Sequence, residues 1–264
     1  MTVAKALTIA GSDSGGGAGI QADLKTFLAL GVYGTSVLTT VTAQNTLGVQ
    51  AVVELPIDFV AQQFDSVLSD IGTHAAKTGM LSSIPLVRIV SQKIQEYGVH
   101  QLVVDPVMVA KGGHPLLREE ARQVLVETLL PLALVVTPNL HEASLLAGME
   151  VTNRASMAEA ARRIQSLGPR YVVIKGGHLE QEEAYDLLFD GHEFHSYTAQ
   201  KIDTICTHGA GCTFSAAITA SLAQGQKIVE AIETAKAFVT RTIAAGVPIG
   251  RGHAPLNHRA GFVP

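Results

Sequence analysis

Residues 207–215, reading Thr-His-Gly-Ala-Gly-Cys-Thr-Phe-Ser, combine the residue types best suited to chemistry in this chain. Gly209 and Gly211 allow positive φ angles and a close approach of the backbone to a ligand, and residues 213–222 have helical character. A loop that leads into a helix N-terminus offers unpaired amides and a positive dipole end, which suit a phosphate. We expect the thiol of Cys212 to ionise more easily there than in solution, as a base or nucleophile. A glycine cap, a loop and a buried cysteine are the plain structural alternative.

A second glycine-rich loop lies near the start of the chain. Residues 6–10 read as an apolar strand, residues 11–19 as Gly-Ser-Asp-Ser-Gly-Gly-Gly-Ala-Gly, and residues 21–30 as a helix, which together are typical of a ligand-binding arrangement. The bunched glycines match neither the dinucleotide fingerprint nor a Walker loop, which needs Lys-Ser or Lys-Thr. A flexible linker is the alternative. Asp23 is expected in the first turn of the helix, where it could complement the helix dipole or face a ligand.

Two uncharged side chains are candidates for contact with a neutral ligand. Residues 34–43 and 49–55 read as adjacent strands of a hairpin or flap, and Gln44 lies at the end of the first. Its amide has both a donor and an acceptor for the edge of a heterocycle, although a solvated turn residue is the alternative. Met80 ends the short strand 75–80 and could line an apolar pocket or simply pack in the core.

Charged residues follow two further predicted strands. Asp105 comes directly after the strand 101–104, at a carboxyl end, where ligands of parallel α/β sheets bind. Lys175 follows the strand 171–174 and precedes two glycines, so it can present a positive charge to a polyphosphate.

Asn139 and Glu142 lie three residues apart on an opening helix turn after the strand 132–137. They therefore project to one side of the helix, where an amide and a carboxylate could hold hydrated Mg²⁺, a cation that needs few protein ligands. A plain helix cap with an acidic third position is the alternative.

The remaining periodicity predicts the elements that position these residues. Residues 185–189 and 193–197 read as an edge hairpin, and the tail 248–264 as a surface extension. The alternation predicts a single α/β domain over residues 1–264, with a doubly wound, mainly parallel sheet, helices on both faces and a small β flap. Further helices are expected at residues 57–71, 84–97, 119–129, 157–167, 213–223 and 228–245.

Composition excludes several classes of protein. Apolar residues make up 47% and charged residues 16%, with 25 glycines, which suits a soluble enzyme-like domain rather than disorder. The net charge of -4 gives no basic surface for nucleic acid or anionic lipid. We expect no signal peptide and no membrane-spanning segment. Cys206 and Cys212 form neither a C-x-x-C pair nor a disulfide framework, so we expect a reducing cytoplasm.

The whole chain resembles the hydroxymethylpyrimidine and phosphomethylpyrimidine kinases of thiamine biosynthesis, a branch of the ribokinase-like fold. The resemblance implies ATP- and Mg²⁺-dependent phosphorylation of 4-amino-5-hydroxymethyl-2-methylpyrimidine, and then of its monophosphate to the diphosphate. Cys206 and Ala210 depart from the Asn and Thr that are usual in the family. Seven motifs in family order carry the resemblance: residues 10–23, 42–45, 77–80, 105–108, 137–139 with Glu142, 175–178 and 207–213.

The resemblance also implies roles for single residues. Gln44 would bind the pyrimidine edge, and the residues near the ring would be Ala18, Asp23, Met80 and Val107. Gly209 and Gly211 would form an anion hole. The residues around the metal, the phosphates and the nucleotide would be Asp105, Asn139, Glu142, Lys175 and Thr207, with Asp105 and Glu142 next to Mg²⁺. Cys212 occupies the place of the aspartate base of related sugar kinases, and we expect it to assist deprotonation of the substrate hydroxyl.

Three other functions remain open. A pyridoxal kinase of the same branch would phosphorylate a similar hydroxymethyl heterocycle. A cysteine-dependent acyl transferase or hydrolase would use Cys212 with His208, and a ligand-binding sensor would have no catalysis. For partners we expect only the small substrate, ATP and a second copy of the chain in a homodimer.

Overall fold

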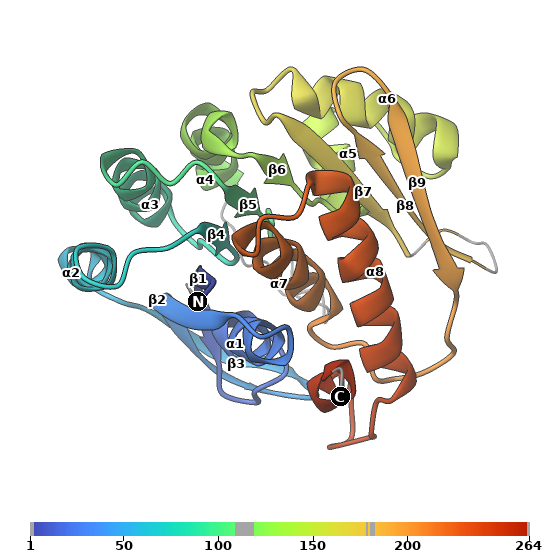
Figure 1. The fold of residues 1–264 in the computed structure, drawn as a ribbon, viewed down its shortest axis with the longest axis horizontal. Helices are drawn as coiled ribbons and strands as arrows, with labels where there is room; N and C mark the ends of the chain where they lie inside the picture. Colours follow the sequence, from blue (N-terminus) through green and yellow to red (C-terminus); the bar gives the residue numbers. More distant parts are fainter. Residues whose placement is uncertain (1–2, 109–118, 178, 180–182, 263–264) are drawn as a thin grey trace.

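The computed structural model describes residues 3–108, 119–177, 179 and 183–262 (Figure 1). Within these residues one sheet is formed by nine strands, in the order β3-β2-β1-β4-β5-β6-β7-β8-β9. The strands are β1 (Lys5–Asp13), β2 (Tyr33–Asn45), β3 (Gly48–Glu54), β4 (Ala75–Thr78), β5 (Leu102–Val104), β6 (Val135–Val136), β7 (Tyr171–Gly176), β8 (Glu183–Phe189) and β9 (Phe194–Gln200).

The pairing of the strands confirms the doubly wound sheet. Neighbouring strands from β2 to β7 are parallel, whereas β3 pairs antiparallel with β2 at one edge, and β8 and β9 form an antiparallel hairpin at the other. The chain passes from β1 to β2 on one side and then returns to place β4 on the other side of β1. Ligands of open α/β sheets bind outside the carboxyl ends of the strands at such a reversal.

Helices cover both faces of the sheet, as expected (Figure 1). Successive side chains of a strand point to opposite faces of the sheet. Leu102 and Val104 of β5 therefore pack into the core under α2 to α6, whereas Val103 packs into the core under α1, α7 and α8. The helices are α1 (Gly19–Ala29), α2 (Ile57–Leu68), α3 (Ile84–Glu96), α4 (Glu119–Val124), α5 (Leu140–Ala147), α6 (Arg154–Gln165), α7 (Ala210–Ala223) and α8 (Ile228–Ala244).

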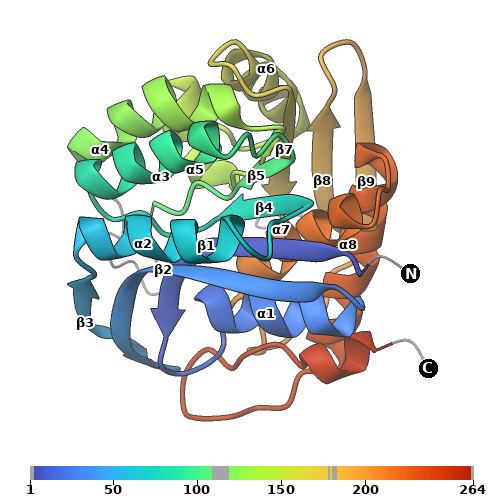
Figure 2. The ribbon, with the colours of Figure 1, turned by 60° about the vertical axis from the view of Figure 1, so that its left-hand side comes forward.

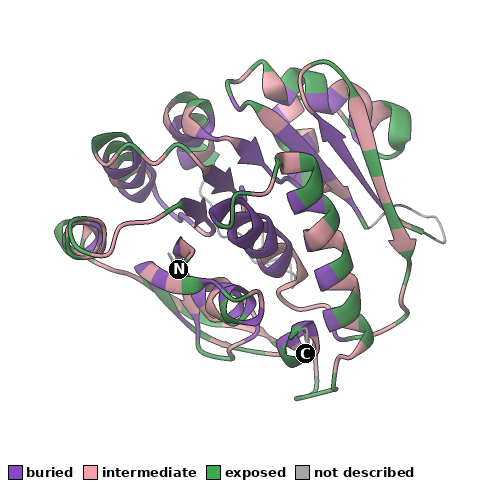
Figure 3. Ribbon diagram, viewed as in Figure 1, coloured by how far each residue is buried: buried purple, intermediate pink, exposed green. Residues whose placement is uncertain are grey.

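Helix α7 is the most deeply placed of these helices. Every residue from Thr213 to Ala223 is buried, and Figure 3 shows the helix enclosed between the sheet and α8. The alanine side chains of α7 are small, so neighbouring elements can pack closely against the helix on all sides. Because α7 is packed in this way, its N-terminus has a fixed position at the carboxyl ends of the parallel strands.

The helix expected over residues 119–129 consists of α4 and a π-helical turn that follows it directly, Leu125–Leu129. One prediction needs correction. The tail is not a surface extension: Ala254, Leu256 and His258 are buried, and the 3-10 helix His258–Gly261 packs on α1 and α8 (Figure 2). No helix in the described part of the chain is long and apolar enough to cross a bilayer.

Candidate active site

A cavity of about 1210 Å³ lies at the carboxyl ends of the parallel strands. Its walls are the end of β1, the tip of the β2–β3 hairpin, the segments after β4, β5 and β6, and the N-terminus of α7. Ligand pockets commonly measure about 300–1,000 Å³, so two small molecules can bind here together. The predicted site residues that line the cavity are Ala18, Gln44, Met80, Asp105, Val107, Asn139, Glu142, Lys175, Thr207, Gly209, Gly211 and Cys212.

The two glycines before and within α7 have different structural roles. Gly209 caps the helix with φ 85°, and a Cβ on it would overlap the carbonyl of Gly17. Gly211 has no positive φ, contrary to the prediction, because it already lies inside the first turn of α7. A Cβ on Gly211 would lie 3.3 Å from Nζ of Lys175, so its lack of a side chain keeps the charged part of the cavity open.

Cys212 lies in the cavity wall at the N-terminus of α7, and its backbone and side chain together are partly exposed whereas the sulfur itself is enclosed. We predicted a lowered pKa from the helix end. That prediction is wrong, because burial raises the pKa of Cys212 to about 11, and the charges of Asp23 and Asp105 add to the increase. The positive charge of Lys77 and a hydrogen bond from the amide of Gly19 oppose it only in part. Cys212 is therefore a protonated thiol at neutral pH.

Lys175 and Asp105 form an ion pair at 2.8 Å in the same wall. Burial alone would raise the pKa of Asp105, but the charges of Lys175 and Lys77 and a hydrogen bond from Ser215 hold it below its usual value. Burial likewise opposes the charge on Lys175, and the carboxylates of Asp105 and Glu142 raise its pKa. Both partners are therefore ionised, and Lys175 is a fixed positive charge. His178, part of the same motif, lies outside the described residues.

Asn139 and Glu142 form the helix cap that was the alternative to a metal site. The Asn139 side chain accepts from the amide of Glu142 at 2.9 Å, and a Glu142 oxygen accepts from the amide of Asn139 at 2.8 Å. Burial, together with the charge of Asp105, raises the pKa of Glu142 to about 7 against the opposing charge of Lys175. Glu142 is thus a buried carboxyl group for which a nearby cation would be favourable.

The oxygen atoms of these side chains suit a cation that also keeps waters and phosphate oxygens as ligands. Among the described residues, no three His, Cys, Asp or Glu side chains cluster closely enough to hold a metal by themselves. Mg²⁺ is commonly bound by one or two carboxylates together with waters and substrate phosphates. The carboxyl groups of Asp105 and Glu142 in the cavity wall fit that pattern.

Comparison with known proteins identifies the family. The family model described as phosphomethylpyrimidine kinase matches residues 13–257. The chain belongs to this family. It is 49% identical to the hydroxymethylpyrimidine/phosphomethylpyrimidine kinase of Bacillus subtilis over 261 residues, which cover 98% of this chain and 96% of that relative.

Two further relatives extend the comparison. A thiamine biosynthesis bifunctional protein of Geobacter sulfurreducens is 53% identical over 252 residues, and the match covers 96% of this chain but about half, 51%, of that relative. The structure of a Bacillus subtilis pyridoxal kinase in an ADP complex superposes with a TM-score of 0.93 at 46% identity, and the match covers 98% of each chain. The phosphomethylpyrimidine kinase family therefore shares this ribokinase-like fold with pyridoxal kinases.

Asp23 does not line the cavity of this family member, although we predicted it near the substrate ring. Its side chain is fully buried and forms an ion pair at 2.8 Å with Lys77, which is also fully buried. Its position in the structure instead explains how a lysine can be buried within β4.

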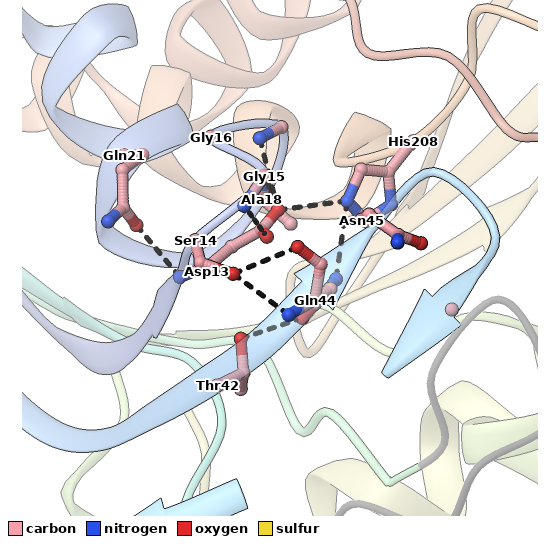
Figure 4. Close-up of polar contacts among 12 residues, drawn as sticks. Asp13, Ser14, Gly15, Gly16, Ala18, Gln21, Thr42, Gln44, Asn45 and His208 are labelled. Atoms are coloured by element: carbon pink, nitrogen blue, oxygen red, sulfur yellow. Dashed lines mark hydrogen bonds and ion pairs between the residues drawn. The ribbon is translucent and has the colours of Figure 1, made fainter. Parts of the chain in front are cut away.

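The sequence predicted no role for Asp13 in this kinase family member, and a role for His208 only in the acyl transferase alternative, yet the two residues organise one end of the cavity (Figure 4). The Asp13 carboxylate accepts from the amides of Gly15, Gly17 and Ala18 at 2.8 to 3.0 Å. Nε2 of His208 lies 3.0 Å from the same carboxylate. The Asp-Ser-Gly sequence is a recognisable turn signal, but nothing in the spacing of residues 13 and 208 predicts their contact.

The C-terminal segment holds both sides of this end of the cavity. The amide of His253 donates to the carbonyl of Thr46 at 2.9 Å, at the tip of the β2–β3 hairpin, and the amide of His208 donates to the carbonyl of Ala254 at 3.0 Å. Nε2 of His258 lies 2.9 Å from the hydroxyl of Thr213 in α7. Burial lowers the pKa of His258 to about 4, so its ring is neutral at pH 7. The tail thus positions the hairpin and α7 relative to each other.

Proposed function

We propose that this chain transfers a phosphoryl group from ATP to 4-amino-5-hydroxymethyl-2-methylpyrimidine, and a second one to the resulting monophosphate. The observation that carries the proposal is that Gln44, Lys175 and the N-terminus of α7 face one cavity. An amide can read the edge of a neutral ring, a helix end can hold the transferred phosphoryl group, and a lysine can neutralise nucleotide phosphates.

Positioning and charge neutralisation carry most of the catalysis in this proposal, because phosphoryl transfer requires little covalent chemistry from the protein. The amides of Gly211 and Cys212 in the first turn of α7 point out of the helix and would stabilise charge that develops on the phosphoryl oxygens, whereas the amide of Ala210 donates to the carbonyl of Thr207. Asp105 holds Lys175 in place for the phosphates.

Asp105 and Glu142, with Asn139 beside them, would hold Mg²⁺ with its waters. The ion would neutralise charge on the phosphates of ATP. Because Glu142 is half protonated near pH 7, a cation beside it would favour the ionised form. Asn139 keeps the Glu142 side chain in place through the reciprocal cap.

Cys212 would accept the proton of the substrate hydroxyl in the first phosphorylation. With a pKa of about 11, roughly one thiol in 10⁴ is ionised at pH 7, so this contribution grows as the pH rises. The second phosphorylation differs, because its nucleophile is a phosphate oxygen that is already ionised near neutral pH. That step needs no strong base.

Phosphorylation of a pyridoxal-type alcohol is the second candidate function. It is supported by the 46% identity and the TM-score of 0.93 with the Bacillus subtilis pyridoxal kinase. An acyl transferase built on Cys212 and His208 has no such support, because the His208 ring contacts Asp13 and Gln44. A sensor without catalysis would leave the Lys175–Asp105 pair and Glu142 without a shared task.

Product analysis tests the proposal directly. The purified chain is incubated with the pyrimidine alcohol, ATP and Mg²⁺, and the products are separated by anion exchange. We expect the monophosphate first and the diphosphate later, with both lost on addition of a metal chelator. Turnover that persists without metal, or the absence of any phosphorylated pyrimidine, would contradict the proposal. The homodimer and the cytoplasmic setting stay predictions from the sequence, and light scattering in solution would test the first.

A further inference from the structure

Four side chains from distant parts of the sequence meet at the end of the cavity that Gln44 lines (Figure 4). Nε2 of His208 lies 3.0 Å from Oδ2 of Asp13 and 3.4 Å from the amide nitrogen position of Gln44. The amide oxygen position of Gln44 lies 3.1 Å from the hydroxyl of Thr42, which is itself 3.0 Å from the carbonyl oxygen of Ser12. Together these contacts determine where the hydrogen atoms must lie.

The hydrogen on His208 is fixed by Asp13. Burial alone would raise the pKa of Asp13, but the hydrogen bonds from His208 and from the amides of Gly15 and Ala18 hold it below its usual value. The carboxylate is therefore ionised and can only accept hydrogen bonds. A lone pair on Nε2 would face this oxygen at 3.0 Å, which is repulsive, so Nε2 of His208 carries a hydrogen.

That hydrogen in turn fixes the orientation of the Gln44 amide. If the NH₂ group of Gln44 faced His208, two donors would oppose each other. The nitrogen and oxygen of a glutamine amide are assigned from their partners, and here the partners require the oxygen to face His208. The single hydroxyl hydrogen of Thr42 cannot go both to Gln44 and to the carbonyl of Ser12. With the two ends of the Gln44 amide exchanged, the NH₂ group donates to that hydroxyl, and the hydroxyl donates to Ser12. In this arrangement no two donors oppose each other, and the second N–H of Gln44 has no partner among these four side chains.

We propose that His208, anchored by Asp13, is a positioning residue that fixes the orientation of the Gln44 amide and thereby selects an aminopyrimidine ring. The proposal rests on the function proposed above. Gln44 retains one N–H and one oxygen lone pair for a ligand. A 4-aminopyrimidine presents a ring nitrogen acceptor beside an amino donor, which matches this pair in one orientation. The pyridine ring of pyridoxine has no ring nitrogen beside an amino group.

A double-mutant cycle tests whether His208 acts through Gln44. The variants are His208→Leu, Gln44→Ala and the double replacement, each assayed for kcat/KM with the pyrimidine alcohol. We expect His208→Leu to lower kcat/KM about tenfold, the effect of one lost polar contact of roughly 1.4 kcal/mol, through KM for the alcohol and not KM for ATP. The double variant should be no worse than Gln44→Ala alone, because contacts that act as a unit are not additive.

Two further variants separate positioning from general structural damage. His208→Gln keeps an N–H that can reach Asp13, and it should restore most of the selectivity for the pyrimidine alcohol over pyridoxine. His195→Leu is the matched control, because it removes a histidine 3.1 Å from Asp190 that does not line the cavity. It should leave both KM values unchanged.

The outcomes distinguish the positioning role from the proposed function. If wild-type protein phosphorylates the pyrimidine alcohol but the losses of His208→Leu and Gln44→Ala add, the positioning role is overturned and the function stands. If wild-type protein phosphorylates neither alcohol, the function fails and this role fails with it. Imidazole ¹⁵N chemical shifts of the ligand-free protein provide a readout apart from activity, and a deprotonated Nε2 on His208 would overturn the hydrogen assignment.

Discussion

Nζ of Lys77 in β4 lies 2.8 Å from Oδ1 of Asp23 in α1, and neither side chain has exposed surface. The hydroxyl of Thr8 donates to the other carboxylate oxygen at 2.6 Å. Burial raises the pKa of Asp23, which the charge of Lys77 opposes, so each charge depends on the other to remain ionised inside the protein. The pair supports α1 against the sheet directly behind the cavity wall.

Removing one partner should therefore destabilise the fold strongly. We expect Asp23→Asn to lower the free energy of unfolding by about 3–5 kcal/mol in urea denaturation, because it leaves the charge of Lys77 buried without a partner. The double replacement Asp23→Leu with Lys77→Met should lose less than Asp23→Asn. As a control, Glu159→Gln removes an exposed ion pair with Arg163 on α6 and should cost less than about 1 kcal/mol. Equal effects of Asp23→Asn and Glu159→Gln would refute this account.

Glu142 should release a proton when Mg²⁺ and ATP bind at pH 7. Its pKa of about 7 leaves the carboxyl group half protonated, and a cation beside it lowers that pKa, so about half a proton should leave. Calorimetric titration in two buffers of different ionisation enthalpy measures this number. Glu142→Gln should abolish the release while keeping the helix cap, because glutamine also serves at the third position. Proton uptake would place phosphate, and not the metal, beside Glu142.

The rate of the first phosphorylation should depend on the ionisation of Cys212. The thiolate becomes more populated as the pH rises toward about 11, so the rate with the pyrimidine alcohol should increase about tenfold per unit between pH 7 and 9. Cys212→Ala should remove this increase and should reduce kcat/KM of the first reaction more than that of the second. Identical pH profiles for wild type and Cys212→Ala would show that Cys212 is not the base.

Two glycines with nearly the same backbone angle offer a matched test of the loop before α7. Gly209 has φ 85° and packs against Gly17, whereas Gly225, after the end of α7, has φ 87° and open space around it. Gly225→Ala should cost about 1–2 kcal/mol of stability and leave kcat unchanged. Gly209→Ala should displace the first turn of α7 and lower kcat at least tenfold under saturating substrate. Comparable kcat values for the two variants would mean that the loop geometry is not needed for transfer.

The sequence predicted the parts of the site that follow from strand ends. Asp105 and Asn139 follow β5 and β6, and Lys175 lies near the end of β7. These three strands are parallel neighbours, so the topology brings the side chains to one cavity. The pKa of Cys212 could not be predicted, because burial and the helix dipole act in opposite directions and only the structure gives the degree of burial. The prediction that Asp23 lies in the first turn of α1 is wrong: the helix begins at Gly19, so Asp23 lies after the first turn, buried against Lys77, which the local sequence does not indicate.

Contacts between distant segments could not be predicted from the sequence either. His208 and Asp13 are 195 residues apart, and no periodicity links a loop before one helix to a turn after the first strand. The tail reads as glycine- and proline-rich surface, yet Ala254 and Leu256 are buried just after His253 pairs with the hairpin at Thr46. Tertiary packing decides such cases, because local composition describes preference and not the surface against which a segment lies.

The measurement that tests the central claim most directly is the ratio of kcat/KM for the pyrimidine alcohol to that for pyridoxine. Both are assayed with saturating ATP and Mg²⁺ on the same preparation. We predict that the pyrimidine alcohol is preferred at least tenfold and is converted to the diphosphate. A preference for pyridoxine, or a pyrimidine product that never proceeds beyond the monophosphate, would contradict the account.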